Sequence, residues 1–417
     1  MARVLPALLA LLLVAGCGGR EEIVEPFEGP WRAWLDSPGG ELPFGLEIAR
    51  GETGLEAVIV NGSERMPVPR VEMSEEGLVL GIDHYDSEIV AKVGDRGRRL
   101  DGRWKKTAGP ESASELTFHA TAGARPRFTY TASTPGKEES SIDGRWAVRF
   151  ASSDEPAVSL FATATDGNVE GTFLTTTGDY RYLAGSFSDG RLRLSCFDGA
   201  HAFLFDASLQ DDGTLTGDFW SRDTWHETWI AERDTNAELA DAFAQTSAVD
   251  GIDLARLVYP DLNGVPRSLA DPAFGGRARL LFVFGSWCPN CSDATDYMVD
   301  LDRRYRDRGL SIVGLAFELT GDPTRDKEQV RLYTAHKEIE YPVLVAGVSD
   351  KTHASEAFPL IDRVRSYPTT IFLDTAGAVR AVHSGFSGPA TGEAHDELRR
   401  EFERLIEQLL DDETRGA

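Results

Sequence analysis

The sequence contains little cysteine, with only 4 such residues among 417. One of them, Cys17, lies in a leader-like N-terminus, and the three that remain are too few for a disulfide scaffold. Histidine is also scarce, and the 8 histidines lack the spacing of zinc ligands. We therefore expect no metal site. The closely spaced pair Cys288 and Cys291 then needs a chemical explanation of its own.

A second absence is that of a long hydrophobic run, since none approaches the roughly 20 apolar residues of a membrane-spanning helix. The apolar stretch 4–15 follows an arginine, as in a signal peptide. Its end, Leu13-Val14-Ala15-Gly16-Cys17, resembles the bacterial lipobox. We expect residues 1–16 to be a lipoprotein signal peptide, Cys17 to be acylated and residues 17–26 to form a tether. The alternative is an ordinary signal peptide that contains a cysteine by chance.

A lipid anchor at Cys17 would also fix the location of the protein. Two or more acyl chains hold a protein stably at a membrane, because each buried methylene contributes about 0.8 kcal/mol. We expect the rest of the chain in the bacterial cell envelope, facing the periplasm. Gly18, in place of an aspartate, favours the outer over the inner membrane in a Gram-negative organism.

Positive charge is in deficit, and the formal net charge is -25. Most of the imbalance falls in residues 1–275, which carry 25 Lys and Arg against 44 Asp and Glu. Repulsion between like charges disfavours nucleic acid and anionic lipid as partners. We expect no nucleic-acid function.

Residues 27–234 show short alternating runs of apolar and polar residues, separated by glycines and by Asp-Gly or Asn-Gly pairs. This pattern is typical of an all-β region. It also repeats, because Trp31 precedes Trp146 by 115 positions and Trp104 precedes Trp220 by 116 positions. The repeat predicts two tandem β-meander modules, each resembling a barrel or a sandwich.

The two β repeats are expected at residues 27–120 and 142–234, with a linker rich in Pro, Thr, Ser and Gly at residues 121–141. Tryptophans at matching strand positions indicate core residues, with a ligand platform as the alternative. Cys196 falls on the apolar side of its strand, which predicts a buried, inert thiol.

From residue 258 to the C-terminus the pattern changes to alternating strands and helices. A helical connector is expected ahead of it, at 235–257. The expected elements of the domain are, in chain order, a hairpin turning at Asn263-Gly264, a strand at 279–284, a helix at 288–308, a strand at 310–317, a helix at 324–337, a short strand or extended loop at 343–345, a hairpin of 370–373 with 379–383, and a final helix with Leu398, Phe402, Leu405 and Leu409 on one stripe. The order βαβα followed by ββα predicts an α/β thioredoxin fold for residues 258–417.

The segment Gly285-Ser286-Trp287-Cys288-Pro289-Asn290-Cys291 lies where a buried strand gives way to a helix. The unpaired N–H groups and the dipole of a helix start favour the thiolate form of Cys288. Pro289 suits the first helical position. Cys291 lies close enough to resolve a mixed disulfide, so the pair forms a two-electron switch without a cofactor. Half of a zinc site and a purely structural disulfide are the alternatives.

These motifs resemble the TlpA/ResA-like family of thioredoxin-fold oxidoreductases over about residues 257–410. The family's W-C-x-x-C motif is matched from Trp287 to Cys291, and its cis-proline loop by Ser366-Tyr367-Pro368-Thr369-Thr370. The resemblance implies dithiol–disulfide exchange with protein substrates, as a reductant more than as an oxidant. It also implies a membrane thiol donor that recharges the cysteine pair.

The resemblance further implies roles for the residues around the pair. Glu318 lies where the family keeps a glutamate that exchanges the proton of Cys291; a surface glutamate at the strand end is the alternative. A cis peptide at Pro368 would hold extended backbone beside the disulfide for a docking partner. The residues implied to contact the substrate are Trp287, Pro289, Tyr367 and Thr369.

Two other functions stay open at this point. A peroxiredoxin shares the fold, although Gly285 occupies the position where such enzymes carry a threonine. Alternatively, the protein is a surface-binding lipoprotein whose β repeats are its working part. The glycine-rich stretch 383–392 either borders the active site or is a plain connector.

Overall fold

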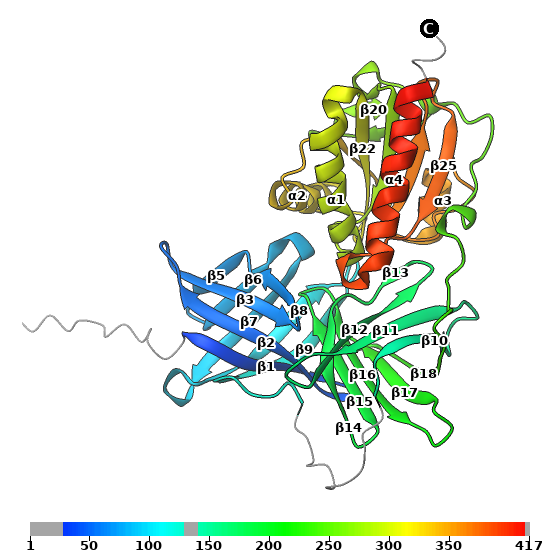
Figure 1. Cartoon of the computed structure of the whole chain (residues 1–417). Coiled ribbons are helices and arrows are strands. Elements are labelled where there is room, and N and C mark those ends of the chain that lie inside the picture. The colour runs from blue at the N-terminus through cyan, green and yellow to red at the C-terminus, as the bar shows by residue number, and fades with distance from the viewer. Residues whose placement is uncertain (1–27, 129–140, 413–417) are drawn as a thin grey trace, which may run out of the picture.

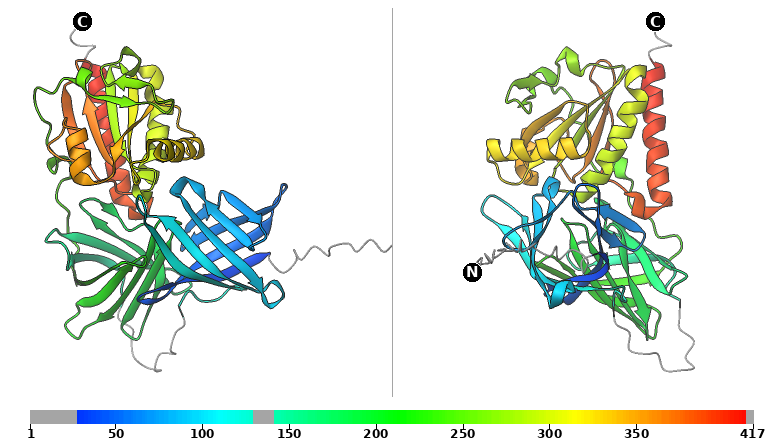
Figure 2. Two further views of the ribbon diagram at one scale, coloured as in Figure 1. Left: turned by 180° about the vertical axis from the view of Figure 1, so that it is seen from behind. Right: turned by 90° about the vertical axis from the view of Figure 1, so that its left-hand side faces the viewer.

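The structure, a computed structural model, describes residues 28–128 and 141–412. Figure 1 shows two β barrels side by side and an α/β domain that lies across both of them, and the views of Figure 2 agree. The signal peptide, Cys17 and the tether lie outside the described residues. No helix of the described part is at once long and apolar enough to cross a membrane.

The first barrel contains nine antiparallel strands in the order β4-β3-β2-β1-β9-β8-β7-β6-β5. The first and last strands of the module pair with each other, while β4 and β5 stand at the two ends of the sheet. Its strands are β1 (Gly29–Ser37), β2 (Gly40–Arg50), β3 (Leu55–Asn61), β4 (Glu64–Pro67), β5 (Arg70–Met73), β6 (Leu78–Ile82), β7 (Ser87–Gly94), β8 (Arg99–Thr107) and β9 (Ala113–Ala122).

The second barrel is closed. β10 pairs with β11 and β18, and β11 pairs with β12, so that eight strands form a ring and the short β13 extends β12. Its strands are β10 (Gly144–Phe150), β11 (Ala157–Thr163), β12 (Asn168–Thr175), β13 (Gly178–Asp179), β14 (Leu183–Ser188), β15 (Arg191–Phe197), β16 (Ala202–Leu209), β17 (Leu215–Ser221) and β18 (Trp225–Arg233). Two tandem all-β modules, predicted from the repeat, are therefore confirmed.

The structure corrects one part of the predicted repeat. β8 and β17 match at an offset of 115 positions, which pairs Gly102 with Gly217 and Trp104 with Phe219. Trp104 and Phe219 are buried, at 0% and 3% exposure. Trp220 comes one residue later, and because neighbouring side chains of a strand point to opposite faces, it points away from the core of the second barrel and packs, partly buried, against the core of the first. Its ring also stacks on His226.

The remaining repeated tryptophans, Trp31 and Trp146, are buried in the cores of their barrels, as expected of core residues. Cys196 is fully buried in the second core. The two barrels pack directly on each other: Asn61 Nδ2 donates to Phe197 O at 2.9 Å, and Phe197 N donates back to Asn61 Oδ1 at 3.2 Å. The β repeats therefore form one continuous body.

The expected helical connector at 235–257 is not an α-helix. It contains two 3-10 turns, η3 (Ala242–Ala244) and η4 (Leu254–Arg256), and otherwise turns, bends and irregular chain. The segment binds the edge of the α/β domain, where Thr246 Oγ1 lies 2.7 Å from Ser384 Oγ and Ala248 forms a bridge with Ile361. These tertiary contacts take the place of intrahelical hydrogen bonds.

The C-terminal domain has a five-stranded sheet in the order β23-β22-β21-β24-β25, with β21 to β23 parallel and β24 and β25 antiparallel. Its elements are the hairpin β19 (Val258–Pro260) and β20 (Pro266–Ser268), then β21 (Ala278–Phe284), α1 (Pro289–Tyr305), β22 (Leu310–Glu318), α2 (Pro323–His336), β23 (Val343–Val348), α3 (Lys351–Ala357), β24 (Thr369–Leu373), β25 (Val379–Ser384) and α4 (Glu393–Asp412). This is the predicted thioredoxin fold.

One helix, α3, was not predicted. It has seven residues, and only Ala354 among them is buried. So short a helix shows no apolar period, and Asp350 caps its start by accepting hydrogen bonds from the N–H groups of Thr352 and His353.

Candidate active site

Cys288 and Cys291 lie together at the N-terminal end of α1. Cys288 is the N-cap residue, and its sulfur accepts the Cys291 N–H at 3.2 Å and the Cys291 thiol at 2.6 Å. Cys288 is 6% exposed and Cys291 is fully buried. Burial, reinforced by the neighbouring Cys288, raises the pKa of Cys291 well above its ordinary value. The two sulfur atoms are thus placed to form a bond with each other, and Cys288 is the one nearer to solvent.

The loop before β24 lies beside this pair. The Tyr367-Pro368 peptide bond is cis, and the Tyr367 carbonyl oxygen lies 3.5 Å from the Cys288 sulfur. Thr369 begins β24 and is buried, with its hydroxyl donating to Ser366 O at 2.8 Å. The loop therefore places the Tyr367 carbonyl group beside the cysteines, and the Thr369 hydroxyl helps to hold the loop.

Trp287 and Pro289 flank Cys288. Trp287 is half-buried, its Nε1 donates to Phe317 O at 2.9 Å, and its ring meets Tyr367 edge to face at 5.5 Å. Pro289 occupies the first turn of α1 and is buried. Of the four residues expected to contact the substrate, Trp287 and Tyr367 thus form one rim of the cysteine site.

Glu318 ends β22 and is 2% exposed. Burial raises the pKa of this carboxyl group to about 7, against the opposing effect of the hydrogen bonds from Ser286. Ser286 donates its backbone N–H at 2.9 Å and its hydroxyl at 2.6 Å. Glu318 therefore holds the turn that precedes Cys288, and its charge acts on Cys291 by raising the pKa of that thiol.

The first barrel adds to this neighbourhood a charged group that no sequence motif indicates. Lys106 of β8 is 3% exposed, and its Nζ donates to Tyr85 O at 2.9 Å. Burial lowers the pKa of Lys106 to about 8, and its positive charge in turn lowers the pKa of Glu318. Only the fold brings these residues together. Among the described residues, no group of three or more His, Cys, Asp or Glu side chains could hold a metal ion.

Comparison with known proteins agrees with this geometry. Residues 253–382 match the model of the AhpC/TSA family. The chain is 29% identical over 124 residues to the thioredoxin-like protein YneN of Bacillus subtilis, covering 30% of this chain and 65% of that protein. It is 25% identical over 141 residues to the thiol-disulfide oxidoreductase ResA of Geobacillus kaustophilus, covering 34% of this chain and 72% of that protein.

A solved structure, a putative thiol:disulfide interchange protein DsbE from Chlorobium tepidum, matches with a TM-score of 0.30 and 22% identity, over 39% of this chain and 99% of that chain. All of the matches described here cover less than half of the chain, and the family model ends before α4. The C-terminal domain of this chain has a thioredoxin fold, and its sequence is similar to those of the ResA thiol-disulfide oxidoreductases.

Proposed function

We propose that the chain is an extracytoplasmic thiol–disulfide oxidoreductase that uses Cys288 and Cys291 to reduce disulfides of protein substrates. The observation that carries this proposal is the position of Cys288. Its sulfur caps α1, accepts the Cys291 N–H and lies beside the cis-proline loop. A sulfur at such a helix start is favoured as a thiolate, which is the attacking species in thiol–disulfide exchange.

The reaction transfers two electrons in two displacements. The Cys288 thiolate attacks one sulfur of the substrate disulfide, so that a Cys288–substrate bond forms and the other substrate sulfur leaves and takes up a proton. Cys291 then loses its proton and attacks the Cys288 sulfur. The second substrate thiol is released, and the Cys288–Cys291 disulfide remains. A membrane thiol donor is proposed to reduce this disulfide for the next cycle.

Glu318 is proposed to help with the proton of Cys291. The buried Cys291 thiol releases its proton reluctantly because its pKa is raised. With a pKa of about 7, the carboxyl group of Glu318 is divided between its acid and base forms near neutral pH, which suits a group that accepts and returns a proton. Because its hydrogen bonds go to Ser286, the transfer would run through Ser286 or through water.

The proposed location follows from the N-terminus. Cleavage after residue 16 and acylation of Cys17 would anchor the chain to a membrane of the envelope, with the outer membrane favoured in a Gram-negative organism. A peroxiredoxin activity is disfavoured, because Gly285 stands three residues before Cys288 and the second cysteine follows three positions later in the same turn.

The first test is titration of the cysteine pair against glutathione, combined with two variants. In wild type we expect a two-electron transition, and Cys288→Ala should abolish exchange with any disulfide. Cys291→Ala should accumulate a mixed disulfide between Cys288 and the substrate, detected by mass spectrometry. Normal turnover by either variant would refute the assignment, and peroxide consumption by wild type would favour the peroxiredoxin alternative.

A further inference from the structure

The face of the C-terminal domain that carries the cysteines lies against the β repeats. In Figure 1 the N-terminal end of α1 points toward the two barrels, and the other views agree. Residues on every side of the cysteine pair contact the repeats, namely Asn290 and Asp293 of α1, Arg325 and Gln329 of α2, Arg365 ahead of the cis-proline loop, and Gly385 and Gly388 after β25. This is the surface on which a folded substrate would have to dock.

Arg181 of the second barrel is the centre of this contact. Its side chain is 7% exposed, and its guanidinium binds Glu64 of the first barrel at 2.6 Å and Asp293 of α1. It also lies 3.5 Å from Asp198. One buried cation therefore joins both barrels to the helix that begins at the cysteines, and Asp293 comes two residues after Cys291.

The backbone of the second barrel lies directly on the cysteine turn. A Cβ atom built on Gly178 would approach Asn290 Nδ2 to 1.9 Å, so any larger residue would have to displace the amide of Asn290, which lies between the two cysteines. The neighbouring Asp179 accepts the Gly388 N–H at 2.6 Å. The glycine-rich stretch after β25 therefore borders the site and is fixed to the repeats.

The first barrel contacts the domain through α2. Gln329 Nε2 donates to the carbonyl oxygens of Asp83 and His84 at 3.0 and 2.9 Å. Arg325 pairs with Asp86 at 2.6 Å. The rings of His84 and His336 stack with their centroids 3.9 Å apart. This side of the cysteine site is closed as well.

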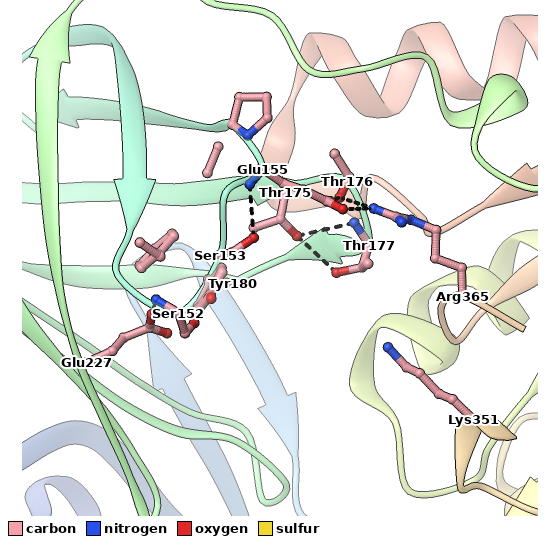
Figure 3. A pocket seen from close by; sticks show the side chains of 13 residues that line it. Ser152, Ser153, Glu155, Thr175, Thr176, Thr177, Tyr180, Glu227, Lys351 and Arg365 are labelled. Carbon is pink, nitrogen blue, oxygen red and sulfur yellow. Dashed lines mark hydrogen bonds and ion pairs between the residues drawn. The ribbon is translucent and has the colours of Figure 1, made fainter.

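The cis-proline side is closed by Arg365, two residues before Tyr367. Figure 3 shows Arg365 reaching across a pocket to Glu155 and Thr176 of the second barrel. Lys351 of the C-terminal domain lines the same pocket. What stays open is narrow: Cys288 is 6% exposed, while Trp287 and Asn290 beside it are half-buried.

We propose that Arg181 is a specificity-determining residue that holds the β repeats over the cysteine site. While the repeats are held there, the chain exchanges with small or extended disulfides and excludes folded proteins. Folded proteins gain access only when the repeats move away. A stable complex of two folded proteins buries about 800 Å² on each partner. Here the repeats occupy the surface around Cys288 that would supply this area. This inference rests on the proposed thiol–disulfide exchange.

Two variants of the full chain test the role of Arg181. Asp293→Asn removes the carboxylate that the C-terminal domain contributes and leaves Arg181 paired within the repeats; Arg181→Gln removes the cation itself. For each protein we would measure the rate of insulin reduction and the rate of reduction of a small aromatic disulfide. Because removing one partner of a buried ion pair is strongly destabilising to the contact, we expect the ratio of the two rates to rise about tenfold.

Arg304→Ala is the matched control, since it breaks the pair between Arg304 and Glu403 at 2.8 Å, which lies within the C-terminal domain. The ratio should stay at the wild-type value in this variant. A ratio that stays unchanged in Asp293→Asn would overturn the specificity proposal, and this variant decides the matter if Arg181→Gln does not fold. A wild type without exchange toward either disulfide would instead refute the proposed function, and the inference with it.

Alkylation of Cys288 provides a second measurement that does not depend on turnover. For each reagent, the rate of labelling at Cys288 is divided by the rate of the same reagent with a free thiol. In the reduced wild type, this relative rate should be much higher for iodoacetamide than for a maleimide that carries a protein-sized polymer. Asp293→Asn should abolish most of this size discrimination. Equal relative rates for both reagents in wild type would show that the repeats leave Cys288 open and would overturn the proposal.

Discussion

Burial in the site raises the pKa of the Glu318 carboxyl group from 4.5 to about 7. The folded chain therefore binds this proton more tightly than the unfolded chain does between those two values. The stability that the protonated form provides is complete below about pH 4.5 and is lost as the pH rises through 7. Above that pH the protein carries a buried carboxylate that only Ser286 and the charge of Lys106 compensate.

Glu318→Gln removes this pH dependence. We expect the unfolding free energy of the C-terminal domain in wild type to fall by on the order of 3 kcal/mol between pH 4.5 and pH 8, relative to the variant. Urea unfolding of both proteins at the two pH values measures the difference. A constant difference between wild type and variant would mean that folding does not raise the pKa of Glu318. A slower resolving step in Glu318→Gln, seen as longer-lived mixed disulfide, would support its proposed role with Cys291.

Strands and helices with a clear period were predictable, whereas elements shaped by their neighbours were not. The buried strands β21 and β22 and both helices that follow them were expected within a few residues of their observed bounds, and a final helix was expected where α4 lies. The segment 235–257 was expected to be helical, but it is irregular and contacts Ser384 and Ile361 of the C-terminal domain. Trp220 shows a similar limit, since a displacement by one residue reverses the face of a strand.

Two matching glycines offer a test of the repeat as a structural unit. A Cβ atom on Gly102 of β8 would lie 1.9 Å from Val90 O, and one on Gly217 of β17 would lie 2.3 Å from Asp206 O. Both strands thus need glycine where the adjacent strand approaches. We expect Gly102→Ala and Gly217→Ala each to lower the unfolding free energy by about 1–3 kcal/mol, because an inserted methyl group must displace backbone.

Gly94→Ala is the control for these variants. A Cβ atom there would find Arg99 O at 3.9 Å, and the φ angle of Gly94 is -120°, which alanine adopts freely. Thermal unfolding followed by circular dichroism should show a lower midpoint for both core variants and a midpoint close to wild type for the control. Wild-type stability in Gly102→Ala would contradict the close approach of β7 and β8.

The association of the three domains could not be read from the sequence. Arg181 lies 117 positions from Glu64 and 112 from Asp293, and charged residues of this kind carry no pattern that distinguishes a buried ion pair from a solvated one. The motif from Trp287 to Cys291 and the cis-proline loop could be found because their chemistry is local. Their enclosure by the repeats depends on contacts between distant segments, as does the position of Lys106 near Glu318.

The contact between the two barrels also depends on Arg127, which follows β9. Its guanidinium donates to Pro43 O and Val60 O of the first barrel, both at 2.8 Å, and to Ser195 O of the second at 3.1 Å. Arg127→Ala would remove these three hydrogen bonds, and only Pro43 O would keep a side-chain donor across the contact, the hydroxyl of Ser195 at 2.5 Å, so we expect a cost on the order of 3 kcal/mol. We expect the barrels to unfold together in wild type and in separate steps in this variant.

Tryptophan fluorescence and circular dichroism during urea unfolding would report the two transitions. Arg149→Ala serves as the control, because its pair with Glu232 is exposed, with side chains 69% and 59% accessible, and exposed pairs contribute little. Coincident transitions in Arg127→Ala would mean that apolar packing alone joins the barrels.

The second barrel is a closed ring, whereas the sheet of the first barrel has two free ends, β4 and β5, which we call its seam. This difference matters at high protein concentration. A ring of eight paired strands offers no free backbone groups to another chain, whereas β4 and β5 end a sheet and could recruit a foreign strand. Both are four residues long, and Pro67 closes β4 with a residue that has no N–H to donate. The seam is thereby protected against the intermolecular pairing that leads to fibrils.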